Sequence, residues 1–271
     1  MIARAPQTFR RRLQCSLARR REWYLRVLRW TGRGSLEKRI YLSLIREGEV
    51  VFDLGANLGY FTLLFSDLAG RGGEVHAFEP VPPTFARLRE TVERCRRYEN
   101  IFLNQAACSD VEGRGVIQMP DDDIEQASLQ PHQEGSWSQA GRITPFETRT
   151  LRLDNYARGR RPGWIHFVKC DVEGAELPAL QGMEAKLKCC RPLLLLEVFS
   201  KWTAGFGYHP VDLIDFLRRL GYDRFFAANA RLIPLVDARA TLAEGADRQS
   251  MNLLCAVGAW HADRLRALRH L

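Results

Sequence analysis

Apolar residues along the chain change repeatedly between short continuous runs and a helical spacing of three or four. The continuous runs predict strands at 49–52, 76–78, 101–106, 164–170, 192–198, 223–227 and 252–257, with a small extra strand at 116–117. The helical spacing predicts helices over 58–68, 82–97, 177–188, 210–220 and 258–271. Strands that alternate with helices are typical of an α/β fold, and we expect a doubly wound, mostly parallel, seven-stranded sheet.

The first 40 residues differ from the rest of the chain in composition. Residues 1–39 contain eleven arginines and one lysine against two glutamates, a net charge of +10, whereas the whole chain carries +8. Leu13, Leu17, Tyr24 and Leu28 recur at helical spacing among these arginines. We therefore divide the chain into a basic helical N-terminal arm, residues 1–40, and a near-neutral α/β domain, residues 41–271.

Two roles are open for this arm. It can form a helical cap that packs on the domain or on a second copy in a homodimer, which we favour, or it can bind a membrane surface or a polyanion through residues 1–30. Arginines interrupt every apolar stretch, so no secretory signal is predicted, and no run approaches the roughly 20 apolar residues that span a bilayer. The seven cysteines have no metal-binding spacing and indicate reduced thiols in a cytoplasmic protein.

A glycine turn follows the first predicted strand. The segment 53–60 reads D-L-G-A-N-L-G-Y, so Gly55 and Gly59 bracket the turn before a helix begins. Glycine is needed where the backbone turns sharply or lets a ligand approach closely. A dinucleotide fingerprint would have glycine in place of Asn57 and Tyr60, and no Gly-Lys-Ser/Thr of a phosphate-binding loop follows. The turn alone fits either a small-ligand site or a buried structural turn.

Glu79 supports the first of these interpretations. It ends the second predicted strand, 26 residues after Asp53, and a helix-length segment separates the two strands. An acid in this place can accept two hydrogen bonds from ribose hydroxyls, although a solvated acid at a strand end is the alternative. Because the glycine turn lies one crossover earlier, we predict ribose binding.

Five motifs follow one another over residues 51–198. They are D-L-G-A-N-L-G-Y-F-T at 53–62, A-F-E-P at 77–80, the segment 104–113, K-C-D-V-E-G-A-E at 169–176 and P-L-L-L-L-E-V at 192–198. Together they resemble the FkbM-type family of S-adenosylmethionine-dependent methyltransferases. The resemblance implies S-adenosyl-L-methionine as the cofactor and O-methylation of a hydroxyl on a sugar, a polyketide-type compound or another small metabolite.

The same resemblance implies where the cofactor binds. The residues concerned are Asp53, Gly55, Ala56, Asn57, Gly59, Thr62, Glu79, Pro80 and Asp110. Asp110 would reach the adenine amino group, although an acid in an ordinary turn is the alternative for this residue.

Charged residues gather at the end of the fourth predicted strand. Lys169, Asp171 and Glu173 lie there, and Glu197 ends the neighbouring strand. The carboxyl ends of parallel strands form the ligand crevice of open α/β sheets. A hydroxyl is a poor nucleophile near pH 7, so a positioned base contributes about 10²–10⁴-fold to the rate. We predict Asp171 as this base, with Lys169 or Glu173 next; if Asp171 instead holds the amino group of the cofactor, Glu173 is the base.

Other polar residues near this point have structural interpretations. The carboxylates at 171, 173 and 197 could gather magnesium, but no catalytic metal is predicted. Glu176 is expected to cap a helix, His166 to pack within a strand, and His209 to make a hydrogen bond at a helix start rather than act as a base.

The acceptor side of the site is less well determined by the sequence. The polar segment 120–141 is expected to be a substrate-side lid, with a plain surface insertion as the alternative. Trp202, Phe206 and Tyr208 are expected to wall the acceptor pocket.

The basic arm suggests a nucleic-acid methyltransferase as an alternative function. The D-V-E-G segment replaces the Asn/Asp-Pro-Pro-aromatic loop common in such enzymes, so nucleic acid is not favoured. A non-catalytic protein that binds the cofactor or a partner is a further alternative.

Overall fold

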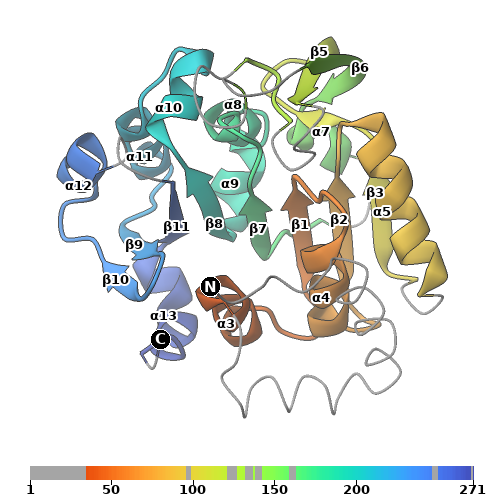
Figure 1. The fold of residues 1–271 in the computed structure, drawn as a ribbon. Coiled ribbons are helices and arrows are strands. Elements are labelled where there is room, and N and C mark those ends of the chain that lie inside the picture. The colour runs from red at the N-terminus through yellow and green to blue at the C-terminus, as the bar shows by residue number, and fades with distance from the viewer. Residues whose placement is uncertain are drawn as a thin grey trace, which may run out of the picture.

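An eight-stranded sheet organises the chain in the computed structural model, which describes residues 35–95, 99–120, 127–131, 137, 142–158, 163–245, 250–269 and 271 (Figure 1). The strands lie in the order β3-β2-β1-β7-β8-β11-β9-β10. Their bounds are β1 Val50–Leu54, β2 Glu74–Phe78, β3 Ile101–Asn104, β7 Phe167–Cys170, β8 Leu193–Val198, β9 Arg224–Ala228, β10 Leu232–Pro234 and β11 Met251–Ala256. From β3 to β8 the strands pair in parallel, whereas β11 is antiparallel to β8 and β9, and β10 to β9.

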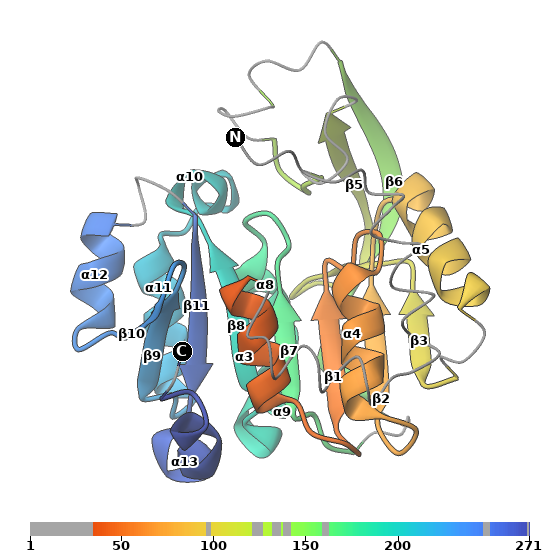
Figure 2. The same ribbon diagram turned by 60° about the horizontal axis from the view of Figure 1, so that its bottom comes forward.

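Helices cover both faces of this sheet, as the doubly wound prediction requires (Figures 1 and 2). One face carries α3 Leu36–Leu44, α4 Tyr60–Ala69, α5 Pro82–Arg94 and α13 Gly258–Arg266. The other carries α7 Leu153–Ala157, α8 Glu176–Gln181, α9 Glu184–Cys190, α11 Pro210–Arg219 and α12 Ala238–Gly245. Successive strand residues point to opposite faces, so Val51 packs under α3 and α4 while Phe52 packs under the helices of the other face. The predicted fold class is therefore confirmed.

Two details differ from the sequence prediction. The sheet has eight strands instead of seven, because β10 adds a short antiparallel edge to β9. The helix predicted over 177–188 is divided into α8 and α9, because Met183 leaves helical geometry at φ −126° and the carbonyl of Gly182 accepts a hydrogen bond from the Asp154 backbone. A side chain at position 182 would also press against the Ser109 carbonyl oxygen.

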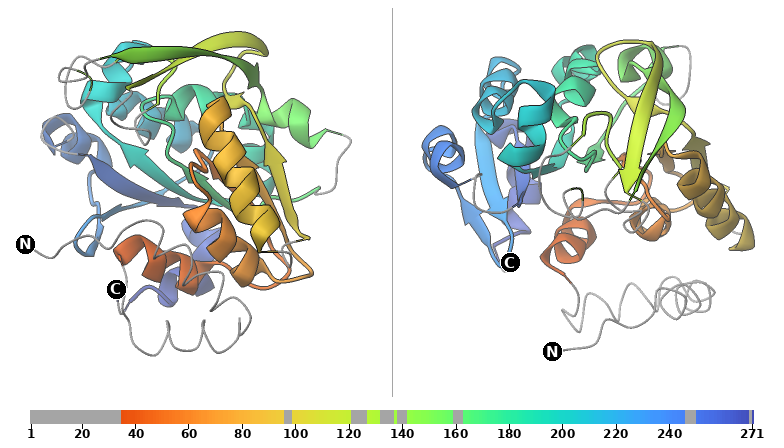
Figure 3. Two further views of the ribbon diagram at one scale, coloured as in Figure 1. Left: turned by 45° about the vertical axis from the view of Figure 1, so that its right-hand side comes forward. Right: turned by 45° about the horizontal axis from the view of Figure 1, so that its top comes forward.

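A second, three-stranded sheet lies beyond the carboxyl ends of the main strands (Figures 2 and 3). It has the order β4-β6-β5, from β4 Ala107–Cys108, β5 Gly113–Pro120 and β6 Ile143–Leu151. The small strand predicted at 116–117 is thus part of an eight-residue strand, and β6 was not predicted. The expected lid over 120–141 connects β5 to β6; only 120, 127–131 and 137 of it belong to the described residues.

The order of the strands places a crevice between β1 and β7. The chain continues from β1 to β2 and β3 on one side, and later from β7 to β8 on the other. The backbone of Asp171 donates to the Leu54 carbonyl, and the backbone of Gly55 donates to the Phe78 carbonyl, both at 3.1 Å. Ligands of open α/β sheets bind at such a switch point, so the loops after β1, β2 and β7 meet where a ligand is expected.

The helix α3 belongs to the body of the domain. Its residues Ile40, Tyr41 and Leu44 are fully buried, and the Tyr41 ring packs edge-on against Phe61, Phe65 and Phe167. The predicted boundary between residues 40 and 41 therefore cuts through a docked helix. The preceding part of the arm, residues 1–34, including the predicted contact surface over 1–30, lies outside the described residues. Within the described part of the chain, no helix has the length and apolar character to cross a bilayer.

Candidate active site

The glycine turn after β1 needs glycine at its first position. Gly55 has φ +77°, and a Cβ atom built on it would lie 1.8 Å from the carbonyl oxygen of Asp171. The turn continues through Asn57, which also has a positive φ of 47°, to Gly59, which has φ +84° and directly precedes α4. Only glycine allows the turn to lie this close to the loop after β7, because any side chain at position 55 would overlap that backbone.

Glu79 fastens the turn to the end of β2. One carboxylate oxygen accepts a hydrogen bond from the Asn57 backbone and the other accepts from the Val81 backbone, both at 2.9 Å. Burial raises the pKa of Glu79 to about 7, although these two N–H groups favour the ionised form. Each carboxylate oxygen still has a lone pair for a further donor, so the predicted ribose contact is compatible with this geometry.

Asp53 and Thr62 lie behind the turn. Both are fully buried, and the Thr62 hydroxyl donates to Asp53 Oδ2 at 2.6 Å. Asp53 Oδ1 lies 3.8 Å from the ammonium nitrogen of Lys169 and has no hydrogen-bond partner among the described residues. The structure therefore brings these two predicted cofactor residues to the base of the turn, where they support its position, and does not place them on the cavity wall.

Lys169, Asp171 and Glu197 form one connected charged group. The Lys169 ammonium donates to Asp171 Oδ2 at 3.0 Å and to the Gly55 carbonyl oxygen at 3.1 Å. Burial opposes the charge of Lys169, but the neighbouring carboxylates of Asp171 and Asp53 raise its pKa above the ordinary value. Lys169 is consequently a permanent cation at neutral pH, and the structure does not favour it as a base.

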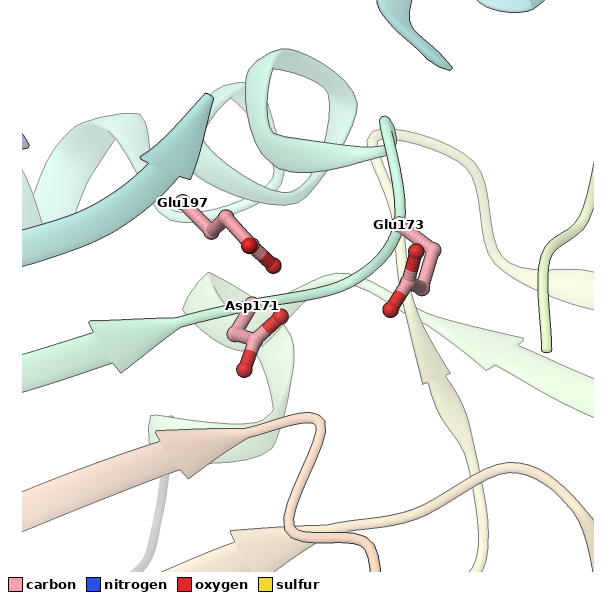
Figure 4. Close-up of side chains that lie close together, drawn as sticks. All are labelled: Asp171, Glu173 and Glu197. Carbon is pink, nitrogen blue, oxygen red and sulfur yellow. The ribbon is translucent and has the colours of Figure 1, made fainter. Parts of the chain in front are cut away.

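Asp171 and Glu197 are neighbouring carboxyl groups, and each changes the pKa of the other. The Glu197 side chain extends from β8 toward Asp171, which directly follows β7 (Figure 4). Burial and the adjacent Asp171 charge raise the pKa of Glu197 to about 10. Burial alone would raise the pKa of Asp171, but Lys169 and the hydrogen bond with Glu197 hold it below its usual value. At neutral pH, Asp171 is therefore ionised and Glu197 is protonated.

Glu173 sits on the tight loop that follows Asp171. It has φ +55°, and the side chain of Glu176 holds this loop by accepting from the backbones of Val172 and Gly174, both at 3.2 Å. Glu176 is thus the capping acid that the sequence indicates. The Ser128 hydroxyl, from the connection between β5 and β6, donates to the Glu173 carbonyl at 2.9 Å, so the small sheet is tied to this loop.

A cavity of about 340 Å³ lies between these loops and the small sheet. Its size is that of a small-molecule site. Its lining residues are Gly55, Asn57, Phe78, Glu79, Pro80, Ala106, Ala107, Cys108, Ile117, Ala127, Leu129, Asp171, Val172, Glu173, Ala175, Glu197 and Trp202. Six of the predicted site residues therefore meet at one cavity: Gly55, Asn57, Glu79, Pro80, Asp171 and Glu173.

The remaining predicted residues lie away from the cavity wall. Ala56 packs against Ala77 and Leu88, close to Gly59. The side chain of Asp110 accepts from the Ser109 hydroxyl at 3.2 Å, as an acid in an ordinary turn does, and this structure gives it no place at the wall.

The aromatic residues and the histidines divide in a similar way. Trp202 lines the cavity, whereas the Tyr208 hydroxyl donates to the Gly174 carbonyl at 2.9 Å and so supports the loop from outside. Phe206 does not line the cavity. His209 accepts from the Val211 backbone and forms a capping box at the start of α11, and His166 Nδ1 accepts from the Val50 backbone. His209 thus has the role predicted for it, whereas His166 lies directly before β7 and binds the Val50 backbone instead of packing within the strand.

The apolar part of the wall was missed by sequence reasoning. Ala106, Cys108, Ile117 and Leu129 come from β4, β5 and the connection after β5. A small apolar residue carries no chemical signal by itself, and these four converge only because β5 pairs with β6 over the crevice.

The residues present fit a nucleoside with a cationic amino-acid tail. Glu79 lies beside the turn with lone pairs to spare, and the amide oxygen of Asn57 is buried at the cavity without a hydrogen-bond partner among the described residues. A buried oxygen without a hydrogen bond is costly, so a hydrogen-bond donor from a ligand would satisfy it.

The side chains of Asp171, Glu173 and Glu197 have oxygens within 4.8 Å of one another and are the group that could hold a metal ion.

Comparison with known proteins agrees with this geometry. Residues 53–224 match the model of the methyltransferase FkbM domain. The chain is 33% identical over 170 residues to 31-O-demethyl-FK506 methyltransferase FkbM of Streptomyces tacrolimicus, covering 52% of this chain and 61% of that protein. It is 29% identical over 179 residues to hexuronic acid methyltransferase AglP of Haloferax volcanii, covering 66% of this chain and 65% of that protein. The matched part thus spans less than two thirds of each relative.

The family match covers the glycine turn, Glu79, and the charged group after β7. It confirms S-adenosylmethionine as the cofactor that the resemblance of the five sequence motifs implies. The chain belongs to the FkbM methyltransferase family.

Proposed function

We propose that this protein transfers a methyl group from S-adenosylmethionine to a hydroxyl of a small molecule, with Asp171 as the general base. When bound, the cofactor supplies a methyl group on a sulfonium for in-line displacement. Gly55, Asn57 and Glu79 would hold it, because they border the cavity beside β1 and β2. The observation that carries the proposal is the ionised Asp171 carboxylate, facing the cavity at the switch point with Lys169 at 3.0 Å.

Asp171 suits the task of taking a proton from a hydroxyl. The Lys169 charge keeps it ionised at neutral pH, so it is available as an acceptor. Glu197 keeps its own proton and can donate to Asp171, which leaves the pair with a single negative charge. A base held in this way needs no reorganisation when the hydroxyl arrives, and such positioning accounts for much of the acceleration of a displacement.

The cavity favours an uncharged or cationic acceptor. Four carboxyl side chains line it, from Glu79, Asp171, Glu173 and Glu197, of which Glu197 keeps its proton at neutral pH. No lysine or arginine lines it within the part of the chain that the structure describes. An acceptor with phosphate or carboxylate groups would meet like charge at this wall. Among the relatives, one is named for 31-O-demethyl-FK506 and the other for a hexuronic acid. The acidic wall supports an acceptor without a carboxylate for this chain.

The same wall argues against nucleic acid as the acceptor, since each nucleotide brings a phosphate charge. A non-catalytic role would not need an ion pair beside a protonated carboxyl in the cavity. The small-molecule hydroxyl acceptor is therefore the function that the site supports best.

The test uses labelled S-adenosylmethionine and a library of neutral, cationic and acidic polyols. We expect label in neutral or amine-bearing acceptors, and loss of about 10²–10⁴-fold in turnover for Asp171→Asn with unchanged cofactor affinity. Wild-type turnover in Asp171→Asn would remove the base assignment. Transfer of label to nucleic acid alone would overturn the proposed acceptor.

A further inference from the structure

The helix α3 brings a carboxylate to the charged group from outside the part of the chain that matches the family. The family match begins at residue 53, whereas Glu37 lies in the first turn of α3. Figure 2 shows α3 in front of β7 and β8, with its first turn nearer the carboxyl ends of the strands than its last. The first turn of α3 therefore lies toward the end of the sheet where the cavity is found.

The position of Glu37 follows from the packing of Tyr41. These two residues are four apart, so they share one face of the helix. Tyr41 contacts the Phe61 ring with centroids 5.0 Å apart, and the Lys169 ammonium lies 5.9 Å from the centroid of the same ring. Glu37 lies one turn earlier on that face, close enough to the Lys169–Asp171 pair for both of their charges to act on its carboxyl group.

Lys38 fixes the same turn of α3 in place. Its ammonium donates to the Tyr60 hydroxyl at 3.3 Å, and Tyr60 is the first residue of α4, directly after the glycine turn. The start of α3 is thus attached to the start of α4, beside the cofactor turn.

Glu37 lacks a counter-charge of its own. It is half-buried, and no hydrogen bond or ion pair joins its carboxylate to another residue of the described ranges. Burial raises its pKa, while Lys169 lowers it and Asp171 raises it, so the charges of all three act on one another. Lys169 is already engaged with Asp171 and Gly55, and Asp171 with Lys169 and Glu197. This end of the site therefore has an excess of negative charge that a ligand cation would balance.

We propose that Glu37, although it is not among the residues that line the cavity, is a cofactor-binding residue that holds the α-ammonium group of the methyl donor, whose amino-acid tail would extend from the cavity toward α3. An alkylammonium has three donors and a full positive charge, which is what the half-buried carboxylate lacks. This assignment leaves Asp171 free to act as the base, so the two carboxylates divide the roles that the sequence left open for Asp171. This inference rests on the proposed function only for the identity of the methyl donor.

The experiment compares two ligands that differ in the ammonium group. S-adenosylhomocysteine carries it, whereas 5′-methylthioadenosine lacks the whole amino-acid tail. For Glu37→Gln in the full chain, we expect calorimetry to show about tenfold weaker binding of S-adenosylhomocysteine and binding of 5′-methylthioadenosine within twofold of wild type. Glu47→Gln, which removes an equal charge from an exposed position shortly after α3, should change neither affinity.

Two outcomes would overturn the assignment: equal loss for both ligands, or unchanged affinity for S-adenosylhomocysteine. If Glu37→Gln fails to fold, Glu37→Asp keeps the charge on a shorter side chain and must still weaken S-adenosylhomocysteine selectively. Binding of both ligands by the wild-type protein is independent of methyl transfer, so failure of this inference and failure of the proposed function are separate results.

Discussion

The Lys169 ammonium donates a hydrogen bond to the carbonyl oxygen of Gly55 at 3.1 Å, which joins the end of β7 to the turn after β1. The same ammonium pairs with Asp171 at 3.0 Å and lies 3.8 Å from Asp53. One buried cation therefore holds together the cofactor turn, the proposed base and the acid beneath them. Its main task is structural and electrostatic.

Lys169→Met is expected to destabilise the fold strongly. Asp53 and Asp171 would lose their shared counter-charge, and breaking a buried ion pair by removing one partner costs about 3–5 kcal/mol. Urea denaturation monitored by circular dichroism measures this loss. The control is Lys188→Met, because Lys188 is 58% exposed and pairs with Glu184 at 2.5 Å on the surface, where the cost is within about 1 kcal/mol. Equal stabilities for the two variants would disprove the central role of Lys169.

Gly55→Ala is expected to abolish cofactor binding as well as lower stability. Alanine at a positive φ costs about 1–2 kcal/mol, and at position 55 its Cβ would also lie 1.8 Å from the Asp171 carbonyl oxygen. The loop that carries Asp171 would have to move. Gly221→Ala isolates the first cost, since Gly221 has φ +92° with no atom within 4 Å of an added Cβ. Thermal unfolding and S-adenosylhomocysteine titration compare the two variants. Equal melting temperatures and equal affinities would contradict the special role of Gly55.

The pKa of Glu79 predicts a pH dependence of stability in the cofactor-free protein. Because burial raises it from the ordinary 4.5 to about 7, folding favours the protonated form. This stabilisation is complete below about pH 4.5 and is lost as the pH rises through about 7. Glu79→Gln cannot ionise, so its free energy of unfolding should fall less than that of wild type between pH 5 and pH 8. Urea denaturation at the two pH values tests this. An equal change in the free energy of unfolding for both proteins would rule it out.

Chelation tests the carboxylate cluster at Asp171, Glu173 and Glu197. Lys169 already balances Asp171, and Glu197 keeps its proton, so we expect turnover in EDTA to remain within twofold of its untreated value. Added magnesium should not increase it. Activity that disappears with EDTA and returns with magnesium would instead assign a metal centre to these three side chains, which lie close enough to form one.

The sequence was sufficient to predict which residues at the ends of β1, β2 and β7 meet at one cavity. Gly55, Asn57 and Glu79 follow directly after strands, so local patterns of β1 and β2 place them correctly at one cavity. Asp171 and Glu173 are found for the same reason at the end of β7. The parallel sheet brings these strand ends together whatever lies between them in the chain.

The sequence was insufficient where distant segments pair. The register of β5 with β6 pairs Gly113 with Thr150, and no sequence pattern near either residue specifies this pairing. The apolar part of the cavity wall, which depends on it, was therefore not predicted. Lys169 was a candidate base because burial and charge balance cannot be read from its neighbours in sequence. The sequence analysis assigned Glu37 to the arm, since only the packing of Tyr41 on Phe61 shows that α3 belongs to the domain.

The guanidinium of Arg264, in α13, bonds to the Leu44 carbonyl at 2.7 Å and to both carboxylate oxygens of Glu49. These contacts secure the segment between α3 and β1, and 215 residues separate Glu49 from Arg264. At about 5–20 residues per second, a ribosome needs roughly 10–40 s to synthesise that interval. During this time the contacts of Arg264 are missing, so α3 is held by other contacts, among them the packing of Tyr41 on Phe61, Phe65 and Phe167. The segment between α3 and β1 is therefore made early and secured late, by the helix at the other end of the described chain.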